Sequence, residues 1–260
     1  MLTAETLYVQ GRHSDLLAPT SLVAAPGDVL LVQADDASSR TALALTLSGR
    51  MKPTSGSLHW NGDRHVGHLR RRSALVDSPE VNEPELHLRV KDLVAEDLAL
   101  IPRAERPKTS PARWLEDLGF SNSSGLWMEQ VPASDRIRLL TALALSDSRI
   151  DQLVLDSPDR HQGDPGAWLP VLQDAVAAAV AAAAATAASR QGRRTAGRNL
   201  TVIAAVAQFP PGWNGPTARA GNAASTAPSP AVIAAEAGTP DPSDNHAPAA
   251  PGPAETEVTA

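Results

Sequence analysis

The chain has 260 residues, which is enough for one large or two small domains with a substantial core. It carries 23 Lys and Arg against 29 Asp and Glu, and this mildly acidic balance argues against a dedicated nucleic-acid-binding protein. With no cysteine, a disulfide framework, thiol catalysis and a Cys-ligated metal are excluded. The first ten residues lack the order of a signal peptide, and we find no run of 18 strongly apolar residues, so we expect no membrane span.

The N-terminal part begins with three short apolar segments, and we expect small antiparallel strands there: Leu2–Val9, Leu16–Val23 and Val29–Val32. The third segment leads through a turn of small residues into a periodic run with Leu43 and Leu47 on one face. A buried strand, a tight loop and a helix N-terminus form the scaffold of a phosphate-binding loop.

The rest of the chain alternates between helical and strand patterns. We predict helices over 90–100, 112–118, 134–145 and 171–188, and strands over 74–76, 152–156 and 200–207. Ser134 or Asp135 is the expected N-cap of the third helix. From about residue 213 the composition turns to Pro, Ala, Gly, Ser and Thr, which cannot bury enough apolar surface, so 213–260 is predicted to be a disordered tail.

The order of these segments resembles the ATP-binding cassette subunits of ABC transporters. The resemblance covers roughly residues 1–208 and is most specific in two places. The first is the Gly-Asp strand, loop and helix that close with Lys-Pro-Thr-Ser-Gly, at 27–56, and the second is the Leu-Val-Leu-Asp strand within 150–158. It implies a P-loop NTPase-like α/β fold with a mixed β core over 1–212, including a small helical subdomain at about 84–146.

The phosphate-binding loop departs from the family pattern. The three family glycines become Ala34, Ala37 and Ser39, and left-handed backbone at such residues would cost about 1–2 kcal/mol each. Arg40 replaces the family lysine, and Thr41 keeps the hydroxyl that binds Mg²⁺. Two aspartates, at 35 and 36, add negative charge where a triphosphate would lie.

The other family motifs are altered as well. The signature glycines become Ala133 and Ser134, which removes the family's clamp on the γ-phosphate of a facing subunit. Asp156 keeps the Mg²⁺-binding carboxylate, whereas the catalytic glutamate becomes Ser157 and the switch histidine becomes Ala207. Asp77 or Ser78 takes the place of the glutamine that contacts Mg²⁺. Asp159 and Asp164 are nearby carboxylates, which we interpret as solvated loop residues rather than as a substitute for the catalytic base.

The resemblance assigns the ligands and partners of the chain. It implies ATP and Mg²⁺ as cofactors, bound by Ser39, Arg40, Thr41, Ala42 and Asp156, with Thr41 and Asp156 as the metal ligands and no catalytic residue retained. It further implies an integral membrane protein of an ABC-type complex as partner, and a dimer with itself or with another cassette subunit. The expected location is cytoplasmic, on the inner face of the membrane through that partner.

Three functional hypotheses follow. The first is a cassette subunit of an ABC-type membrane transport complex, impaired in hydrolysis and acting as a nucleotide-binding or regulatory subunit. The second is a structural module that docks on a membrane partner without nucleotide. The third, a working ATPase, needs a replacement base and a replacement clamp, and the sequence offers neither.

Overall fold

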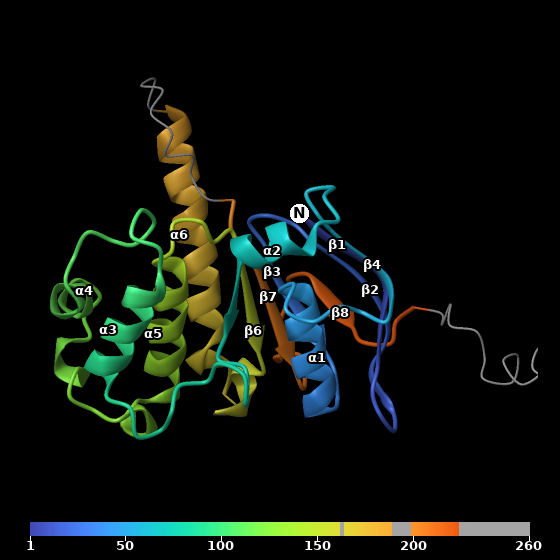
Figure 1. Ribbon diagram of the computed structural model, residues 1–260, viewed down its shortest axis with the longest axis horizontal. Helices are drawn as coiled ribbons and strands as arrows, with labels where there is room; N and C mark the ends of the chain where they lie inside the picture. The colour runs from blue at the N-terminus through green and yellow to red at the C-terminus, as the bar shows by residue number, and fades with distance from the viewer. Residues whose placement is uncertain (162–163, 189–198, 224–260) are drawn as a thin grey trace, which may run out of the picture. The chain divides into compact units, whose positions relative to one another are not determined.

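A computed structural model describes residues 1–161, 164–188 and 199–223, which form a layered α/β unit built on two sheets (Figure 1). The smaller sheet is antiparallel, with strand order β2-β1-β4. Its strands are β1 (Leu2–Gln10), β2 (Asp15–Ala24) and β4 (Ser55–Trp60). The two N-terminal apolar segments therefore form the antiparallel strands that the sequence predicts.

The larger sheet has five parallel strands in the order β5-β6-β7-β3-β8. They are β3 (Val29–Gln33), β5 (Ser73–Val76), β6 (Gln152–Asp156), β7 (Thr201–Val206) and β8 (Thr217–Arg219). The prediction that Val29–Val32 is antiparallel was wrong. Four of the five residues of β3 are buried, so both of its faces need cover, which a strand inside a parallel sheet receives.

The strands of the parallel sheet send alternate residues into two different cores. Leu31 and Leu155 face a core shared with the helices, whereas Leu30, Val154 and Ile203 face a core shared with the antiparallel sheet. This period of two is the ordinary consequence of strand geometry. The parallel sheet is therefore the central layer, with one core on each of its faces.

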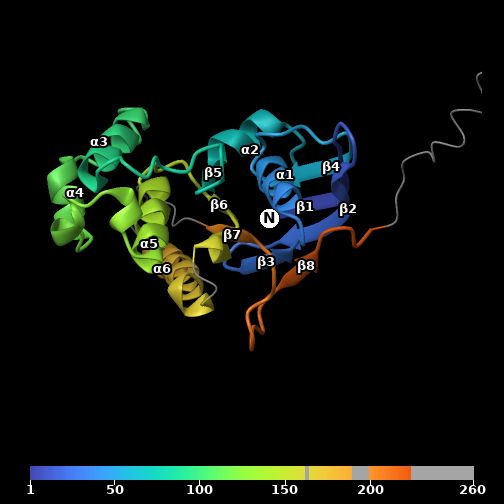
Figure 2. The ribbon, with the colours of Figure 1, turned by 90° about the horizontal axis from the view of Figure 1, so that it is seen from below.

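Helices cover both faces of this central layer (Figures 1 and 2). On one face α1 (Ala37–Leu47) packs against β6, β7 and β2, and α2 (Val66–Arg72) leads into β5. The other face carries α5 (Ala133–Leu145) and α6 (Leu169–Ala188), with α3 (Val90–Leu100) and α4 (Pro111–Asp117) packed beyond α5. Within the described residues, four short 3-10 helices complete the elements: η1 (Ser121–Ser123), η2 (Met128–Gln130), η3 (Pro158–Arg160) and η4 (Pro165–Ala167).

The start of α5 corrects one prediction. Ser134 or Asp135 was expected to cap this helix, but it begins at Ala133 with Pro132 in the cap position and no side-chain cap hydrogen bond. Proline is well placed at a helix start because it has no N–H group to satisfy there. The two polar residues therefore lie inside the first turn.

The beginning of the predicted tail also needs correction. Thr217–Arg219 forms β8, which pairs in parallel with β3 at the edge of the large sheet, and the backbone N–H of Leu31 donates to Pro216 O at 3.1 Å. The backbone groups on the outer edge of β3 make the hydrogen bonds that hold β8 in place. The composition of residues 217–219 gives no sign of this pairing. The remainder of the predicted tail, 224–260, and the Arg-rich stretch within 189–198 lie outside the described residues.

One helical stretch of the described chain, Pro165–Ala185, is long and apolar enough to cross a membrane by length and composition alone, with a mean hydropathy of 1.5. The expectation of no membrane span was based on runs of strongly apolar residues, and this stretch consists largely of alanine. Such a stretch is weak evidence for a span, and Trp168, Leu172 and Val176 pack into the core beside the parallel sheet.

Candidate functional site

The candidate site lies at the carboxyl ends of the parallel strands, where loops from several strands meet. A short loop after β3 leads into α1, whose first turns carry Arg40 and Thr41, and β6 ends in Asp156. The loop after β5 contributes Asp77 and Ser78. The hydrogen bonds at this site join residues 78 to 117 positions apart in the sequence, so it is the fold that brings Arg40, Thr41 and Ser78 to the end of β6.

Asp156 is the centre of the site and is only 1% exposed. Its Oδ2 accepts hydrogen bonds from Thr41 Oγ1 and Ser78 Oγ, both at 2.7 Å, and its Oδ1 accepts one from Ser157 Oγ at 2.9 Å. A buried carboxylate needs such partners because burial removes its water. The structure thus brings together the two predicted magnesium ligands, Thr41 and Asp156, and adds two serines.

Arg40 turns back onto its own loop. Its Nη1 donates to the backbone oxygens of Ala34 at 2.8 Å and Asp35 at 2.7 Å, and its Nε donates to Ser157 Oγ at 2.8 Å. The guanidinium therefore joins the loop after β3 to the end of β6. A phosphate cradle presents backbone N–H groups to its ligand, whereas this loop presents carbonyl oxygens to a cation.

The loop avoids the backbone strain that glycine replacement would bring. Ala34, Ala37 and Ser39 all have negative φ, since the described non-glycine residues with positive φ lie elsewhere. Instead α1 begins at Ala37, and Arg40 already donates its backbone N–H to Asp36 O. The residues that would form a wide loop are wound into the first turn of the helix.

The other two predicted nucleotide contacts lie on this same helix. Ser39 is half-buried in the first turn, beside Arg40, whereas the Ala42 side chain is fully buried in the core between α1 and the two sheets. The structure therefore brings Arg40, Thr41 and Asp156 together at the site, and it directs the side chain of Ala42 away from it.

These residues fit a magnesium ion but not, as arranged, a triphosphate. The hydroxyls of Thr41 and Ser78 and the carboxylate of Asp156 are the hard oxygen donors that Mg²⁺ prefers. For phosphate, however, the carbonyl oxygens of Ala34 and Asp35 face the site and the Arg40 guanidinium is already engaged. No cluster of three His, Cys, Asp or Glu that could hold a metal occurs among the described residues.

The position after Asp156 is occupied by a strained, buried serine. Ser157 has a left-handed backbone, with φ 52° and ψ 56°, and its side chain is engaged by Asp156 and Arg40. A serine hydroxyl there cannot act as a general base, because it has no accessible basic form near neutral pH. Asp159, a nearby carboxylate, accepts the backbone N–H of Ala207 at 2.9 Å, which ties it to the end of β7.

Sequence reasoning missed a second charged cluster around Asp77. Arg136 of α5 donates to both carboxylate oxygens of Asp77, at 2.7 and 3.1 Å, while Arg160 and His161 contact it at 3.1 and 2.7 Å. Burial raises the pKa of Asp77, but the hydrogen bonds from His161 and Arg136 and the charges of Arg136 and Arg160 outweigh it and hold the pKa well below its usual range.

A sequence signal for this cluster was available. Arg136 occupies a buried position of an otherwise apolar helix face, beside Ile137, Leu139 and Leu140. A charged residue on such a face requires a buried partner of opposite charge. The partner itself could not be found without the fold, because Asp77 lies 59 residues earlier.

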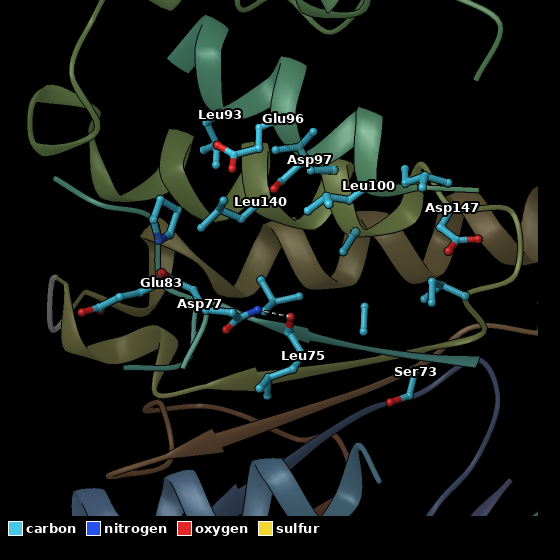
Figure 3. Close-up of a pocket in the computed structure, with 18 of the residues that line it drawn as sticks. Ser73, Leu75, Asp77, Glu83, Leu93, Glu96, Asp97, Leu100, Leu140 and Asp147 are labelled. Atoms are coloured by element: carbon cyan, nitrogen blue, oxygen red, sulfur yellow. Dashed lines mark hydrogen bonds between the residues drawn. The ribbon is translucent and has the colours of Figure 1, made fainter. Parts of the chain in front are cut away.

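A groove of about 750 Å³ lies beside the free edge of β5 and runs between this strand, α3 and α5 (Figure 3). The edge is partly capped, since Asn82 Nδ2 donates to Leu75 O at 2.7 Å and Arg50 Nη2 donates to Ser73 O at 3.2 Å. Charged residues of both signs line the groove: Arg50, Arg70, Arg71, Arg149, Asp77, Glu83, Glu85, Glu96, Asp97 and Asp147. Burial, followed by the charge of Glu96, raises the pKa of Asp97 above its usual value.

Comparison with known proteins confirms the expected fold. An ABC transporter ATP-binding protein from Pyrococcus furiosus is similar with a TM-score of 0.57 and 16% identity, covering 84% of this chain and 96% of that chain. A bacterial ABC transporter cassette solved as a dimer has a TM-score of 0.54 and 16% identity, covering 80% of this chain and 88% of the other.

A third similar structure is cbiO1 from Clostridium perfringens, which is described as part of the ABC transporter complex cbiONQ. It has a TM-score of 0.50 and 13% identity, and the match covers 80% of this chain and 78% of that one. No protein-family model and no curated protein matches the sequence. At these identities the comparisons establish the fold: this is an α/β chain with the architecture of ABC transporter ATP-binding cassettes.

Proposed function

We propose that this chain, which has the ABC cassette fold, is a cassette subunit of an ABC-type membrane transport complex and is impaired in ATP hydrolysis. One observation carries the proposal. The residue after Asp156 is Ser157, whose hydroxyl is held between Asp156 and Arg40 and cannot activate a water molecule. A cassette in this form would act as a nucleotide-binding or regulatory subunit rather than as a subunit that hydrolyses ATP.

The nucleotide part of the proposal concerns ATP with Mg²⁺. Thr41 and Asp156 are the residues that would hold the ion, and Arg40 supplies the positive charge at the position of the family lysine. Ser39 and Ala42 complete the proposed set on the same helix. Because the carbonyl oxygens of Ala34 and Asp35 face the site, we expect weak binding of nucleotide.

Calorimetry on the full chain tests this proposal. Mg-ATP is titrated into the wild type and into an Arg40→Ala variant, and the bound nucleotide is then recovered and identified. Saturable binding that is lost in the variant, with ATP recovered intact, supports a non-hydrolysing nucleotide-binding subunit. Recovery of ADP from the wild type alone would contradict impaired hydrolysis.

We further propose that the groove beside β5 receives a helical segment of the integral membrane partner, which would hold the chain at the inner face of the membrane. The capped edge of β5 disfavours an added strand, because Ser73 O and Leu75 O already have partners. Asp97 is partly desolvated next to Glu96, so a Lys or Arg of the partner would stabilise its charged form. The dimeric cassette structure supports pairing with a second cassette subunit as well.

A photo-crosslinking residue at Leu100, which lines the groove and is 77% exposed, tests the docking proposal in cells that express the native complex. The matched control carries the same residue at Val180, which is 52% exposed on α6 and does not line this groove. We expect a crosslink to an integral membrane protein from position 100 only. Equal crosslinking from both positions would contradict a docking site in the groove.

The second candidate function is a nucleotide-independent module that docks on a membrane partner. It is favoured by one observation, the hydrogen bonds of Arg40 to Ala34 O and Asp35 O, which leave the loop closed on itself. No calorimetric response to millimolar Mg-ATP, together with an undiminished crosslink from Leu100, would establish this alternative over the first.

A further inference from the structure

We infer that Arg40 is a latch, meaning a side chain that closes the nucleotide site from within and that nucleotide must displace before it binds. The inference rests on the proposed function, because it concerns the regulation of the same site. It goes beyond that function in assigning to Arg40 a role in the empty protein. Arg40 would stabilise the closed loop and oppose nucleotide entry.

The contacts of Arg40 describe a closed form. Three hydrogen bonds of 2.7–2.8 Å reach acceptors on two segments, the loop after β3 and Ser157 after β6, and Ser157 lies 117 residues beyond Arg40. A planar guanidinium can serve all three acceptors because its N–H groups point in fixed directions. The ammonium group of lysine has only one nitrogen atom, so it cannot donate to all three acceptors in this geometry.

The acceptors themselves show that the closed form is built for a cation. The carbonyl oxygens of Ala34 and Asp35 point at the guanidinium, and the exposed carboxylates at 35 and 36 add further negative charge nearby. Phosphate oxygens would be repelled by the same carbonyl groups. Nucleotide can therefore enter only when Arg40 has left them and the loop has turned.

The latch also satisfies groups that would otherwise need another partner. Ser157 Oγ donates to Asp156 Oδ1 and accepts from Arg40 Nε, so the guanidinium completes the chain of hydrogen bonds around a buried carboxylate. Chains of this kind strengthen each other in a poorly solvated interior. Removing Arg40 should thus lower the stability of the nucleotide-free protein. Removing an arginine that only pointed into solvent to bind phosphate would not have this effect.

The test uses the full chain in four forms: wild type, Arg40→Lys, Arg40→Ala, and the control Arg113→Lys, which alters an exposed arginine of α4. Melting temperatures are measured without nucleotide, and Mg-ATP affinities are measured by calorimetry. We expect both Arg40 variants to melt at least about 3 °C below the wild type, while Arg113→Lys is unchanged. Arg40→Lys should bind Mg-ATP about tenfold more tightly than the wild type, since the open fraction rises while the charge is kept.

The outcomes separate the latch from the proposed function. Unchanged melting temperatures, or wild-type affinity equal to or above that of Arg40→Lys, would overturn the latch even if ATP binds. Lower melting temperatures with no ATP binding by any form would support the closed loop and contradict the nucleotide part of the proposed function. Should Arg40→Ala fail to fold, Arg40→Lys alone decides between these outcomes.

Discussion

Asp77 and Arg136 form an ion pair with two hydrogen bonds, and the side chains are only 3% and 6% exposed. The pair joins the end of β5 to α5, so it connects the central sheet to the helices that pack on one of its faces. Arg160 extends the link to Glu83, with 2.8 Å between Nη2 and Oε2, in the loop that lines the groove. The helices are thus fixed to the sheet by charge as well as by apolar packing.

Arg136→Ala should lower the free energy of unfolding by about 3–5 kcal/mol, because it leaves the Asp77 carboxylate buried without its main partner. The measurement is chemical denaturation followed by circular dichroism. Arg113→Ala, which removes an exposed arginine paired with Glu116 and Asp117, is the control and should cost less than about 1 kcal/mol. Equal costs would show that the buried pair is not special.

The depressed pKa of Asp77 predicts a pH dependence. A carboxyl group with a lowered pKa in the fold contributes stability above its unfolded pKa of about 3.9 and loses it as the pH falls towards the lower folded value. The difference in unfolding free energy between the chain and its Asp77→Asn variant should therefore shrink from pH 5 to pH 3. Both forms carry His161→Gln, which removes the imidazole beside Asp77 and leaves its ion pairs with Arg136 and Arg160. A difference that stays constant or grows would contradict the account.

Ser78→Ala should destabilise the protein by about 1–2 kcal/mol, because Asp156 Oδ2 loses one of its two hydroxyl donors in a buried site. Differential scanning calorimetry gives the change. Ser134→Ala, at an exposed position in the first turn of α5, should change stability by less than about 0.5 kcal/mol. A neutral Ser78→Ala would mean that Thr41 alone satisfies this oxygen.

The sequence predicts much of the fold because its signals are local. Leu30, Leu31 and Val32 form a short apolar run after Gly27 and Asp28, which is typical of a buried strand, and the resemblance in 27–56 places a helix after it. The pairing of Thr217–Arg219 with β3 was missed because three residues with little apolar character carry no local strand signal. Their hydrogen bonds are supplied by a strand almost 190 residues earlier.

The sequence predicts that Thr41 and Asp156 belong to the candidate site, but it does not predict how Arg40 is arranged there. Thr41 and Asp156 were expected to meet, and they do. The direction in which Arg40 points could not be read from the sequence, since both a phosphate and the carbonyls of Ala34 and Asp35 are chemically suitable partners for it. Only the fold shows that residues 37–41 belong to α1 and that the carbonyl oxygens of Ala34 and Asp35 lie within hydrogen-bonding distance of Arg40.

The central claim is that this cassette does not turn over ATP, and release of inorganic phosphate measures it most directly. The full chain is incubated with millimolar Mg-ATP beside an Asp156→Asn variant, which alters the proposed magnesium carboxylate. The account predicts that phosphate release by the wild type does not exceed that of the variant. Saturable release by the wild type that Asp156→Asn abolishes would contradict it and identify a working ATPase.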